Sequence, residues 1–483
     1  MNIPVKKILI VGGGLIGWWA AVFLKKSVPN IHISILNSQV EDTYAETLEP
    51  NFANYLQLIG LTEQHIIKYT DGNFAFAQAY FGWLRTGNNY FHSADGLSFD
   101  YDAVEFNQWI LKLRKNDPSI KIDDYSVSAV AARLGKSPLR LNKKPIAALS
   151  FDLGLLKKLL MSYALDLAID VINKELLAVE LDSAGDIDFI VASDASILTS
   201  DFYIDASGYT GDLIAKAMGV AYESWSAYLP FHKKKISVVP QQDSRLIPFT
   251  SLQLTQQGWL KSIPLKNKIV CEYIYDDALL GAENGKNAIA DFFVNGQDVN
   301  FYPGQRQKIW HKNCLAMGAA AITADGFSHS PLYLAAVTLK QFMAYWPSHQ
   351  QFDAVENEFN RLMRTEYESI RDLHCLHYAV INMQAFSTNT FWREIKLPES
   401  LQYRLDLFME TGRALPDEST LLHPSQWIHL ALGLGCWPRK YDYIASHHSD
   451  DIYVQYSQSI KASIQASIEN LPDYTDYLKS YIS

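Results

Sequence analysis

The 483-residue sequence is poor in cysteine and has no excess of positive charge. Its four cysteines, Cys271, Cys314, Cys375 and Cys436, lie far apart and form no C-x-x-C pair. This favours reduced, buried thiols in a cytoplasmic protein over a disulfide framework. The formal net charge of −10 gives no electrostatic support to nucleic-acid binding. No apolar stretch approaches the length that spans a membrane, so a membrane protein is not expected.

Apolar and aromatic side chains, by contrast, are abundant. Hydrophobic residues make up 48% of the chain and aromatic residues 13%, whereas charged residues make up only 19%. This composition is typical of a globular protein with a large core and excludes an intrinsically disordered chain. The aromatic share suits an enzyme that binds flat ligands, and it equally suits a large aromatic core. A chain of this length is expected to hold more than one subdomain.

A glycine pattern near the start of the chain is the clearest local signal. Residues 8–11 (Ile-Leu-Ile-Val) predict a buried parallel strand, and the glycines that follow are spaced as G-x-G-x-x-G. Gly12 allows the tight turn, Gly14 lets a diphosphate approach the backbone, and Gly17 lets the next helix pack closely on the strand. The pattern therefore predicts a dinucleotide site, with a plain strand–turn–helix connection as the alternative.

The helix after these glycines begins at Leu15 and Ile16, whose backbone amides are expected to bind the diphosphate at the positive end of the helix dipole. Residues 31–36 predict the second strand of the unit, and this strand ends at Asn37. An acidic residue usually binds the ribose hydroxyls at this place. An asparagine can still form that hydrogen bond, but without the charge assistance, a loss of roughly 1 kcal/mol.

The rest of the chain alternates between strand-rich and helix-rich stretches. Residues 168–205 and the residues up to about 280 show strand patterns, whereas the periodicity from residue 334 onward is mostly helical. We therefore predict an α/β (α+β) protein with a Rossmann-like nucleotide-binding module. Residues 1–340 would form this module with interleaved substrate-side strands, and residues 341–483 a helical C-terminal substrate part.

Several stretches resemble, in order and over nearly the whole chain, segments of the flavin-dependent tryptophan halogenases. The first is the glycine turn with its two tryptophans, Trp18 and Trp19, and another is Asp205-Ala-Ser-Gly208, which is similar to a second flavin-contacting segment. The full set of similar stretches is 12–21, 205–214, 225–230, 258–265, 310–318, 330–332, 371–378 and 391–393, together with Trp427, Gly433, Gly435 and Pro438. Together they are far more specific than any one of them.

The resemblance implies a flavin-monooxygenase fold and a defined chemistry. In this family reduced FAD, supplied by a separate flavin reductase, and oxygen convert halide into hypohalous acid. That species passes through a tunnel to a small aromatic substrate, where a lysine holds it and a glutamate assists. The resemblance also implies flavin-side contacts by Glu46, Asp205 and Gly208, and it suggests a homodimer.

The chain departs from this family at both catalytic positions. Aligning the family's lysine segment on Trp83 puts Ala75 at the lysine position, and a methyl group cannot donate a hydrogen bond. Aligning the family's P-L-E segment on Pro331-Leu332 puts Tyr333 at the glutamate position, and a phenol is a poor base at neutral pH. The small residues beside it, whose backbone the family uses for halide, become Ala335 and Ala336.

Three functions remain open from the sequence. The favoured hypothesis is an FAD-binding homologue that no longer halogenates tryptophan by the family's route. The second is an active halogenase of an indole or another aromatic compound with relocated catalytic groups, for which Lys261, two residues after Trp259 on a predicted strand, is the candidate. The third is a non-catalytic FAD- or ligand-binding protein.

No metal site is predicted. His374 and His377 lie on one face of a predicted helix, but no third ligand accompanies them, so they are interpreted as packing or surface residues.

Overall fold

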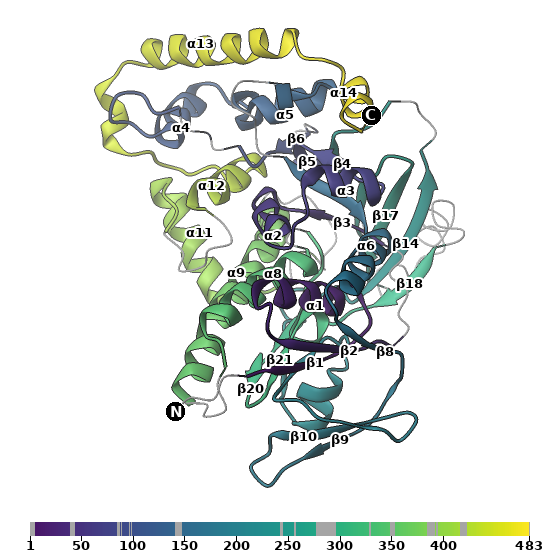
Figure 1. Cartoon of the computed structure of the whole chain (residues 1–483). Coiled ribbons are helices and arrows are strands. Elements are labelled where there is room, and N and C mark those ends of the chain that lie inside the picture. Colours follow the sequence, from purple (N-terminus) through teal and green to yellow (C-terminus); the bar gives the residue numbers. More distant parts are fainter. Residues whose placement is uncertain are drawn as a thin grey trace.

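The computed structural model describes residues 5–482 apart from 39–43, 85–86, 88, 96, 98, 141–146, 242–244, 256, 277–295, 328–329, 348–352, 384–391, 393–394 and 416–422. It confirms a mixed α/β architecture (Figure 1). Within this part of the chain, no helix is both long enough and apolar enough to cross a bilayer.

The nucleotide-binding module is organised around a six-stranded sheet with the strand order β20-β21-β12-β1-β2-β8. All its neighbouring strands are parallel except β20 and β21. Its strands are β1 (Lys7–Val11), β2 (His32–Leu36), β8 (Asp170–Ile172), β12 (Phe202–Asp205), β20 (Trp310–His311) and β21 (Cys314–Ala316). Because β1 lies between β2 and β12 and is buried, its side chains are apolar on both faces, as the sequence predicts.

Helices cover one face of this sheet. Helix α1 (Leu15–Ser27) connects β1 to β2 and packs against α6 (Leu153–Asp166) and α8 (Pro331–Ala344). Beyond the other face lie η4 (Asp212–Ala217) and the antiparallel sheet of β9 (Leu176–Leu181), β10 (Ile187–Ala192) and β11 (Ile197–Leu198) (Figure 1). The predicted boundary at residue 340 falls within α8, and the division of the chain there remains a prediction.

A seven-stranded sheet joins two distant parts of the chain. Its strand order is β18-β14-β17-β16-β15-β5-β6, and only β15 and β5 pair in parallel. Its strands are β5 (Ala77–Phe81), β6 (Tyr90–His92), β14 (Lys233–Pro240), β15 (Phe249–Leu254), β16 (Gly258–Pro264), β17 (Lys268–Tyr275) and β18 (Gln297–Asn300). Strands from residues 77–92 and 233–300 thus interleave in one sheet, and their place on the substrate side stays a prediction.

Two further sheets have three strands each. One contains β3 (Ala45–Leu48), β7 (Ala148–Asp152) and β4 (Asn73–Ala75), and the other contains β13 (Tyr222–Ser224), β19 (Gly304–Arg306) and β22 (Ile322–Thr323). Asp152 ends β7 and also caps α6, because its Oδ1 accepts a hydrogen bond of 2.8 Å from the Leu155 amide. The acidic residue and the apolar run at residues 151–160 predict a helix from Phe151, but Phe151 belongs to β7 and the helix begins at Leu153.

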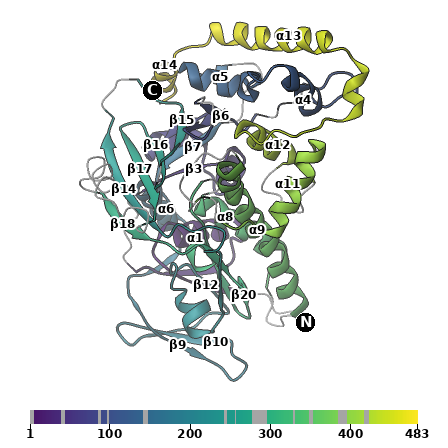
Figure 2. The same ribbon diagram turned by 180° about the vertical axis from the view of Figure 1, so that it is seen from behind.

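The C-terminal helices pack on helices from the first third of the chain. Helix α13 (Asp450–Glu469) lies along α4 (Phe106–Asn116) and α5 (Val127–Leu134) in both views (Figures 1 and 2). The other helices are α2 (Ala53–Leu58), α3 (Glu63–Tyr69), α9 (Asp353–Met383), α11 (Glu399–Thr411), α12 (Pro424–Gly433) and α14 (Tyr474–Ile482). The helical part is therefore built from both ends of the sequence.

Candidate functional site

The turn between β1 and α1 leaves backbone amides available to a ligand. Gly14 is the N-cap of α1, and it has no side chain with which to cap the helix. The first turn, which contains Leu15, Ile16 and Gly17, holds no acidic residue. The first N–H groups of a helix have no partner inside the helix, and the helix dipole makes this end positive. This end of α1 can therefore accept a diphosphate.

Two glycines of the turn are required by close backbone contacts. Gly12 has φ +133°, and a Cβ atom at this position would lie 2.1 Å from the Ala206 carbonyl oxygen. A Cβ atom at Gly17 would lie 2.0 Å from the Gly12 carbonyl oxygen. The roles expected for Gly12 and Gly17 thus match the local geometry, whereas the close approach of a diphosphate to Gly14 stays a prediction. The residues fit a dinucleotide cofactor such as FAD.

Asn37 and Asp205 lie at the carboxyl ends of β2 and β12, the two strands that flank β1 in the sheet. The Asn37 amide group donates a 2.7 Å hydrogen bond to Asn173 Oδ1, and Asn37 Oδ1 lies beside the glycine turn. Asp205 is fully buried and accepts hydrogen bonds from the Ser207 hydroxyl and from the amides of Leu213 and Ile214, at 2.6, 2.9 and 2.8 Å.

These contacts engage both carboxylate oxygens of Asp205 within its own chain. Burial raises the pKa of this carboxyl, and the hydrogen bonds from Ser207 and the helix amides oppose that rise. Asp205 therefore holds the turn that precedes η4, and a direct contact with the cofactor remains a prediction. Gly208 in the same turn has φ +88° and open space where a Cβ atom would lie.

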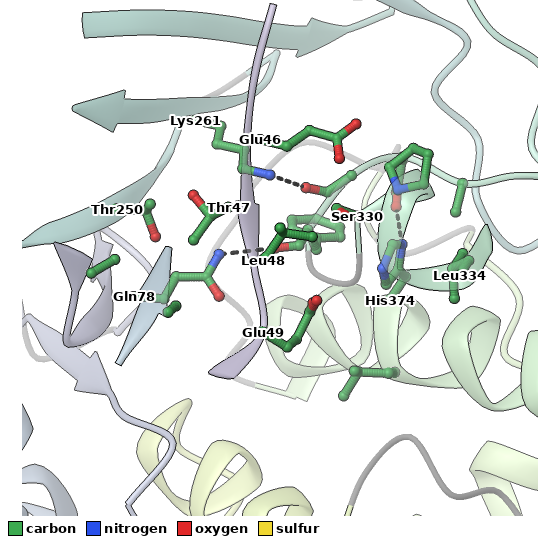
Figure 3. Close-up of a pocket in the computed structure, with 18 of the residues that line it drawn as sticks. Glu46, Thr47, Leu48, Glu49, Gln78, Thr250, Lys261, Ser330, Leu334 and His374 are labelled. Carbon is green, nitrogen blue, oxygen red and sulfur yellow. Dashed lines mark hydrogen bonds and ion pairs between the residues drawn. The ribbon is translucent and has the colours of Figure 1, made fainter. Parts of the chain in front are cut away.

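A cavity of about 690 Å³ begins beside the diphosphate cradle, which is the glycine turn and helix start at residues 12–17. Gly318 lines the cavity, and a Cβ atom at this glycine would lie 3.0 Å from the Ile16 side chain at the start of α1. Further lining residues come from β3, β4, β5, β16 and the first turns of α8, as well as from α9 (Figure 3). A volume of this size is typical of pockets for small organic molecules.

The two positions at which the chain departs from the family have different surroundings. Ala75, which the sequence predicts to stand at the family's lysine position, ends β4 and is part of the cavity wall. Tyr333 is not among the residues that line the cavity. Its hydroxyl accepts a 2.7 Å hydrogen bond from the Asn51 amide, and its ring packs against Phe52 and Tyr55. Burial raises the pKa of this phenol. Tyr333 therefore stabilises the contact between α8 and the residues around position 52.

Ala335 and Ala336 lie in the second turn of α8 and are buried. A backbone amide at this depth in an α-helix donates to the carbonyl four residues earlier. The resemblance to the family implies that these two amides bind halide. Their position inside the helix does not support this expectation, because both N–H groups are expected to be used by the helix itself. The N-cap residue Ser330 accepts from the Tyr333 amide at 3.1 Å.

Lys261 and Glu46 extend from different strands into the same cavity as Ala75 (Figure 3). The Lys261 ammonium donates a 2.8 Å hydrogen bond to the Gly326 carbonyl oxygen. Burial raises the pKa of the Glu46 carboxyl to about 7, and a hydrogen bond with Ser330 and the charge of Lys261 oppose that rise. The cavity thus contains an ammonium and a carboxyl even though neither stands at the family's positions.

The wall of the cavity also contains polar groups that no pattern in the sequence predicts. Asp325 is buried, and its carboxylate contacts His374 Nδ1 at 2.6 Å and the hydroxyl of Tyr378. The Gln78 amide donates to the Phe327 carbonyl oxygen at 2.9 Å. No motif marks these residues, because they come from segments far apart in the sequence and meet only in the folded chain.

The two histidines of α9 serve in packing and hydrogen bonding, as interpreted from the sequence. His377 is held between the Leu373 carbonyl oxygen, 3.0 Å from Nδ1, and the Tyr80 hydroxyl, 3.1 Å from Nε2. Burial lowers the pKa of His377 to about 3, so its imidazole is neutral at physiological pH. Across the described residues, no group of three or more His, Cys, Asp or Glu side chains is arranged to hold a metal ion.

Comparison with known proteins agrees with the fold and the cradle. The chain is 22% identical to the tryptophan 6-halogenase SttH of Streptomyces toxytricini over 476 residues, covering 89% of each chain. It is 23% identical to the tryptophan 7-halogenase RebH of Lentzea aerocolonigenes over 443 residues, covering 84% of this chain and 82% of RebH.

Solved structures show the same fold. The flavin-dependent halogenase Xcc4156 from Xanthomonas campestris superposes with a TM-score of 0.92 at 24% identity, covering 99% of this chain and 98% of that one. BrvH, a flavin-dependent halogenase from Brevundimonas sp. BAL3, gives a TM-score of 0.92 at 23% identity and covers 99% of both chains. The family model of the tryptophan halogenases matches residues 7–450, and the chain therefore belongs to the tryptophan halogenase family.

Proposed function

We propose that this protein is an FAD-dependent halogenase of a small aromatic compound in which Lys261 replaces the family's lysine. One observation carries the proposal: the Lys261 ammonium and Ala75, at the family's lysine position, line one cavity. Within the described residues, the Gly326 carbonyl is the only hydrogen-bond partner of that ammonium, so two of its three N–H donors remain for a ligand. This proposal corresponds to the second sequence-based hypothesis, in which the catalytic groups are relocated. It differs from the favoured sequence-based hypothesis, in which halogenation is lost.

The cradle would hold FAD through the amides at the start of α1, while Asn37 would contact the ribose. Reduced FAD, supplied by a separate flavin reductase, would give two electrons to oxygen, and the oxygen activated in this way would oxidise halide to hypohalous acid. The role of Lys261 is to bind hypohalous acid by hydrogen bonding and to place it against the substrate ring. A fixed position for a reactant is worth several orders of magnitude in rate.

The substrate class follows from the cavity wall. Phe76, Tyr80, Phe301 and Phe327 place aromatic rings along it. A rigid stack backs one side, because the Phe327 ring lies 4.1 Å from Trp259 and 4.4 Å from His377, centroid to centroid. Flat apolar molecules gain from stacking on such a wall. We propose an indole or another small aromatic compound, with free tryptophan suggested only by the relatives' activities.

A second candidate is an FAD-binding protein that does not halogenate. It is favoured by the methyl group at Ala75 and by the engagement of the Tyr333 hydroxyl with Asn51, which together remove both groups the family uses.

The test supplies the purified protein with FAD, NADH, a flavin reductase, oxygen, bromide and indole. We expect brominated indole above a no-enzyme control, and a loss of about 100-fold or more in Lys261→Met, since positioning effects reach this size. Lys115→Met, at an exposed site near the end of α4, is the matched control and keeps wild-type turnover. FAD affinity, measured by flavin fluorescence, is expected to be the same in all three proteins.

Two outcomes would contradict the proposal. Wild-type turnover in Lys261→Met would remove the role of this lysine. Normal FAD binding and flavin reoxidation without any brominated product would favour the non-halogenating candidate.

A further inference from the structure

Glu46 brings into the cavity a carboxyl with an unused hydrogen-bonding atom. It lies on β3 and faces the cavity, and across the described residues its buried Oε2 atom has no hydrogen-bond partner. A buried polar atom without a partner is costly, so such atoms are rare in folded proteins and call for an explanation. A ligand that occupies the cavity and bonds to Oε2 would supply one.

The other carboxyls of the wall have different surroundings. The Asp325 carboxylate is engaged by His374 and Tyr378. Glu272 forms an ion pair with Lys234 at 3.7 Å. These groups are already partnered, so Glu46 is better placed than either of them to exchange a proton with a ligand. Glu49, three residues after Glu46 and just beyond the end of β3, also lines the cavity and is the comparison residue for Glu46.

The charges around Glu46 come from three strands of the seven-stranded sheet. Lys261 on β16 and Lys234 on β14 favour the charged form, Glu272 on β17 disfavours it, and the side chain of Ser330 at the start of α8 lowers the pKa by hydrogen bonding. Desolvation is the largest effect and opposes these, so that the pKa of Glu46 is raised from 4.5 to about 7. At neutral pH this carboxyl is therefore present in both protonation states.

We propose that Glu46 is the acid–base catalyst of the halogenation step, giving one proton to the leaving oxygen and taking one from the substrate ring. The inference rests on the proposed function and adds to it the residue that handles the protons. Tyr333, at the family's glutamate position, cannot do this, because its phenol is engaged with Asn51 and its pKa is raised.

The step balances in atoms and electrons. The halogen of hypohalous acid bonds to a ring carbon as the oxygen–halogen bond breaks, and the oxygen leaves as hydroxide with that electron pair. The protonated Glu46 carboxyl donates its proton to the hydroxide, which becomes water. The Glu46 carboxylate then removes the proton from the same ring carbon, and the C–H electron pair restores aromaticity. Hypohalous acid and arene become haloarene and water, and the carboxyl returns to its starting state.

The experiment compares Glu46→Gln with wild type in the bromide and indole assay across pH 5.5–9. We expect Glu46→Gln to lose about 100-fold or more of turnover, the usual size of a general acid–base effect. Wild-type turnover is expected to fall as the pH rises through about 7, because the acid form of Glu46 starts the cycle, and Glu46→Gln lacks this titration. Glu49→Gln is expected to lose much less, and Glu180→Gln, on the exposed edge of β9, to lose nothing.

A second measurement does not depend on turnover. Infrared difference spectra of the FAD-loaded protein between pH 5.5 and 9 are expected to show a carboxyl band that titrates near pH 7 and is missing in Glu46→Gln.

The results separate the two proposals. Turnover above half of wild type in Glu46→Gln, a larger loss in Glu49→Gln, or no titrating band near pH 7 would overturn the role of Glu46. If neither wild type nor any variant yields brominated product while the flavin is reoxidised normally, the halogenase proposal itself fails, and the role of Glu46 fails with it.

Discussion

The diphosphate cradle and the cavity beside it differ in what they are made of. The cradle consists of backbone amides and glycine positions within residues 12–17, and close contacts such as that between Gly12 and the Ala206 carbonyl constrain it. The cavity consists of side chains from strands and helices spread between residues 45 and 430. The cradle keeps the family pattern, whereas Ala75 and Tyr333 depart from it. A site made of backbone tolerates little change, while one made of side chains can move its functional groups to another wall.

The largest effect that would test this comparison is a substitution in the cradle. Gly12→Ala is expected to abolish FAD binding, because its Cβ atom would lie 2.1 Å from a backbone oxygen at a φ of +133°, and backbone cannot move aside as a side chain can. Gly219→Ala is the matched control, since Gly219 also has a positive φ, +72°, but open space around the missing Cβ atom. Flavin fluorescence measures binding, and circular dichroism checks the fold.

Retained FAD affinity in Gly12→Ala would show that the backbone of the cradle tolerates substitution as readily as the side chains of the cavity. This result would contradict the difference between the two sites.

The next effect concerns the rigidity of the cavity wall. Phe327→Ala is expected to lower the free energy of unfolding by about 3–5 kcal/mol, the range for a buried phenylalanine. The ring is 1% exposed and lies between Trp259 and His377. Denaturant titration measures the change. Tyr443→Ala, at a side chain that is 80% exposed, should change stability little.

A loss below about 1 kcal/mol in Phe327→Ala would mean that the aromatic wall is loosely packed. The cavity would then be a poor template for placing a substrate ring.

A smaller effect is expected from the pH dependence of Glu46. Its pKa is about 7 in the folded chain against 4.5 for an exposed glutamate. Between these values the folded state holds a proton that the unfolded state has released, so stability falls as pH rises through this window. Glu46→Gln is therefore expected to be more stable than wild type at pH 8, by at most about 3 kcal/mol, and equal to it near pH 4.

Thermal unfolding at both pH values checks this prediction. A variant that is less stable than wild type at pH 8 would mean that the carboxylate has favourable contacts in the fold, and that burial does not dominate.

The smallest expected effect lies again in the cradle. Asn37→Asp is expected to strengthen FAD binding by roughly 1 kcal/mol, about fivefold, because a carboxylate forms a charge-assisted hydrogen bond with a ribose hydroxyl. The hydrogen bond to Asn173 can be kept if the Asn173 amide turns to donate. Flavin fluorescence titration is the measurement. Weaker binding in Asn37→Asp would show that the amide at this position is adapted to its surroundings.

Much of the fold was predictable from local patterns. The strand–turn–helix unit at residues 7–27, the strand up to residue 36 and the strands between 168 and 205 were all identified, because each has its own hydrophobic periodicity. The start of α4 was not. The pattern of residues 100–111, with an acidic residue at its start, predicts a helix from Asp100, but α4 begins at Phe106. Asp100 instead accepts a hydrogen bond from the Phe106 amide across a turn with φ +54° at Asp102.

The sequence by itself determined where a diphosphate can bind, because that site depends on neighbouring residues and on a backbone conformation that only glycine adopts. It also showed that the side chains at positions 75 and 333 lack the family's functional groups. Only the tertiary structure placed Lys261 and Glu46, more than two hundred residues apart, in the wall of one cavity. Contacts between residues so far apart in the sequence depend on how the sheets and helices pack against one another, and no local sequence pattern predicts them.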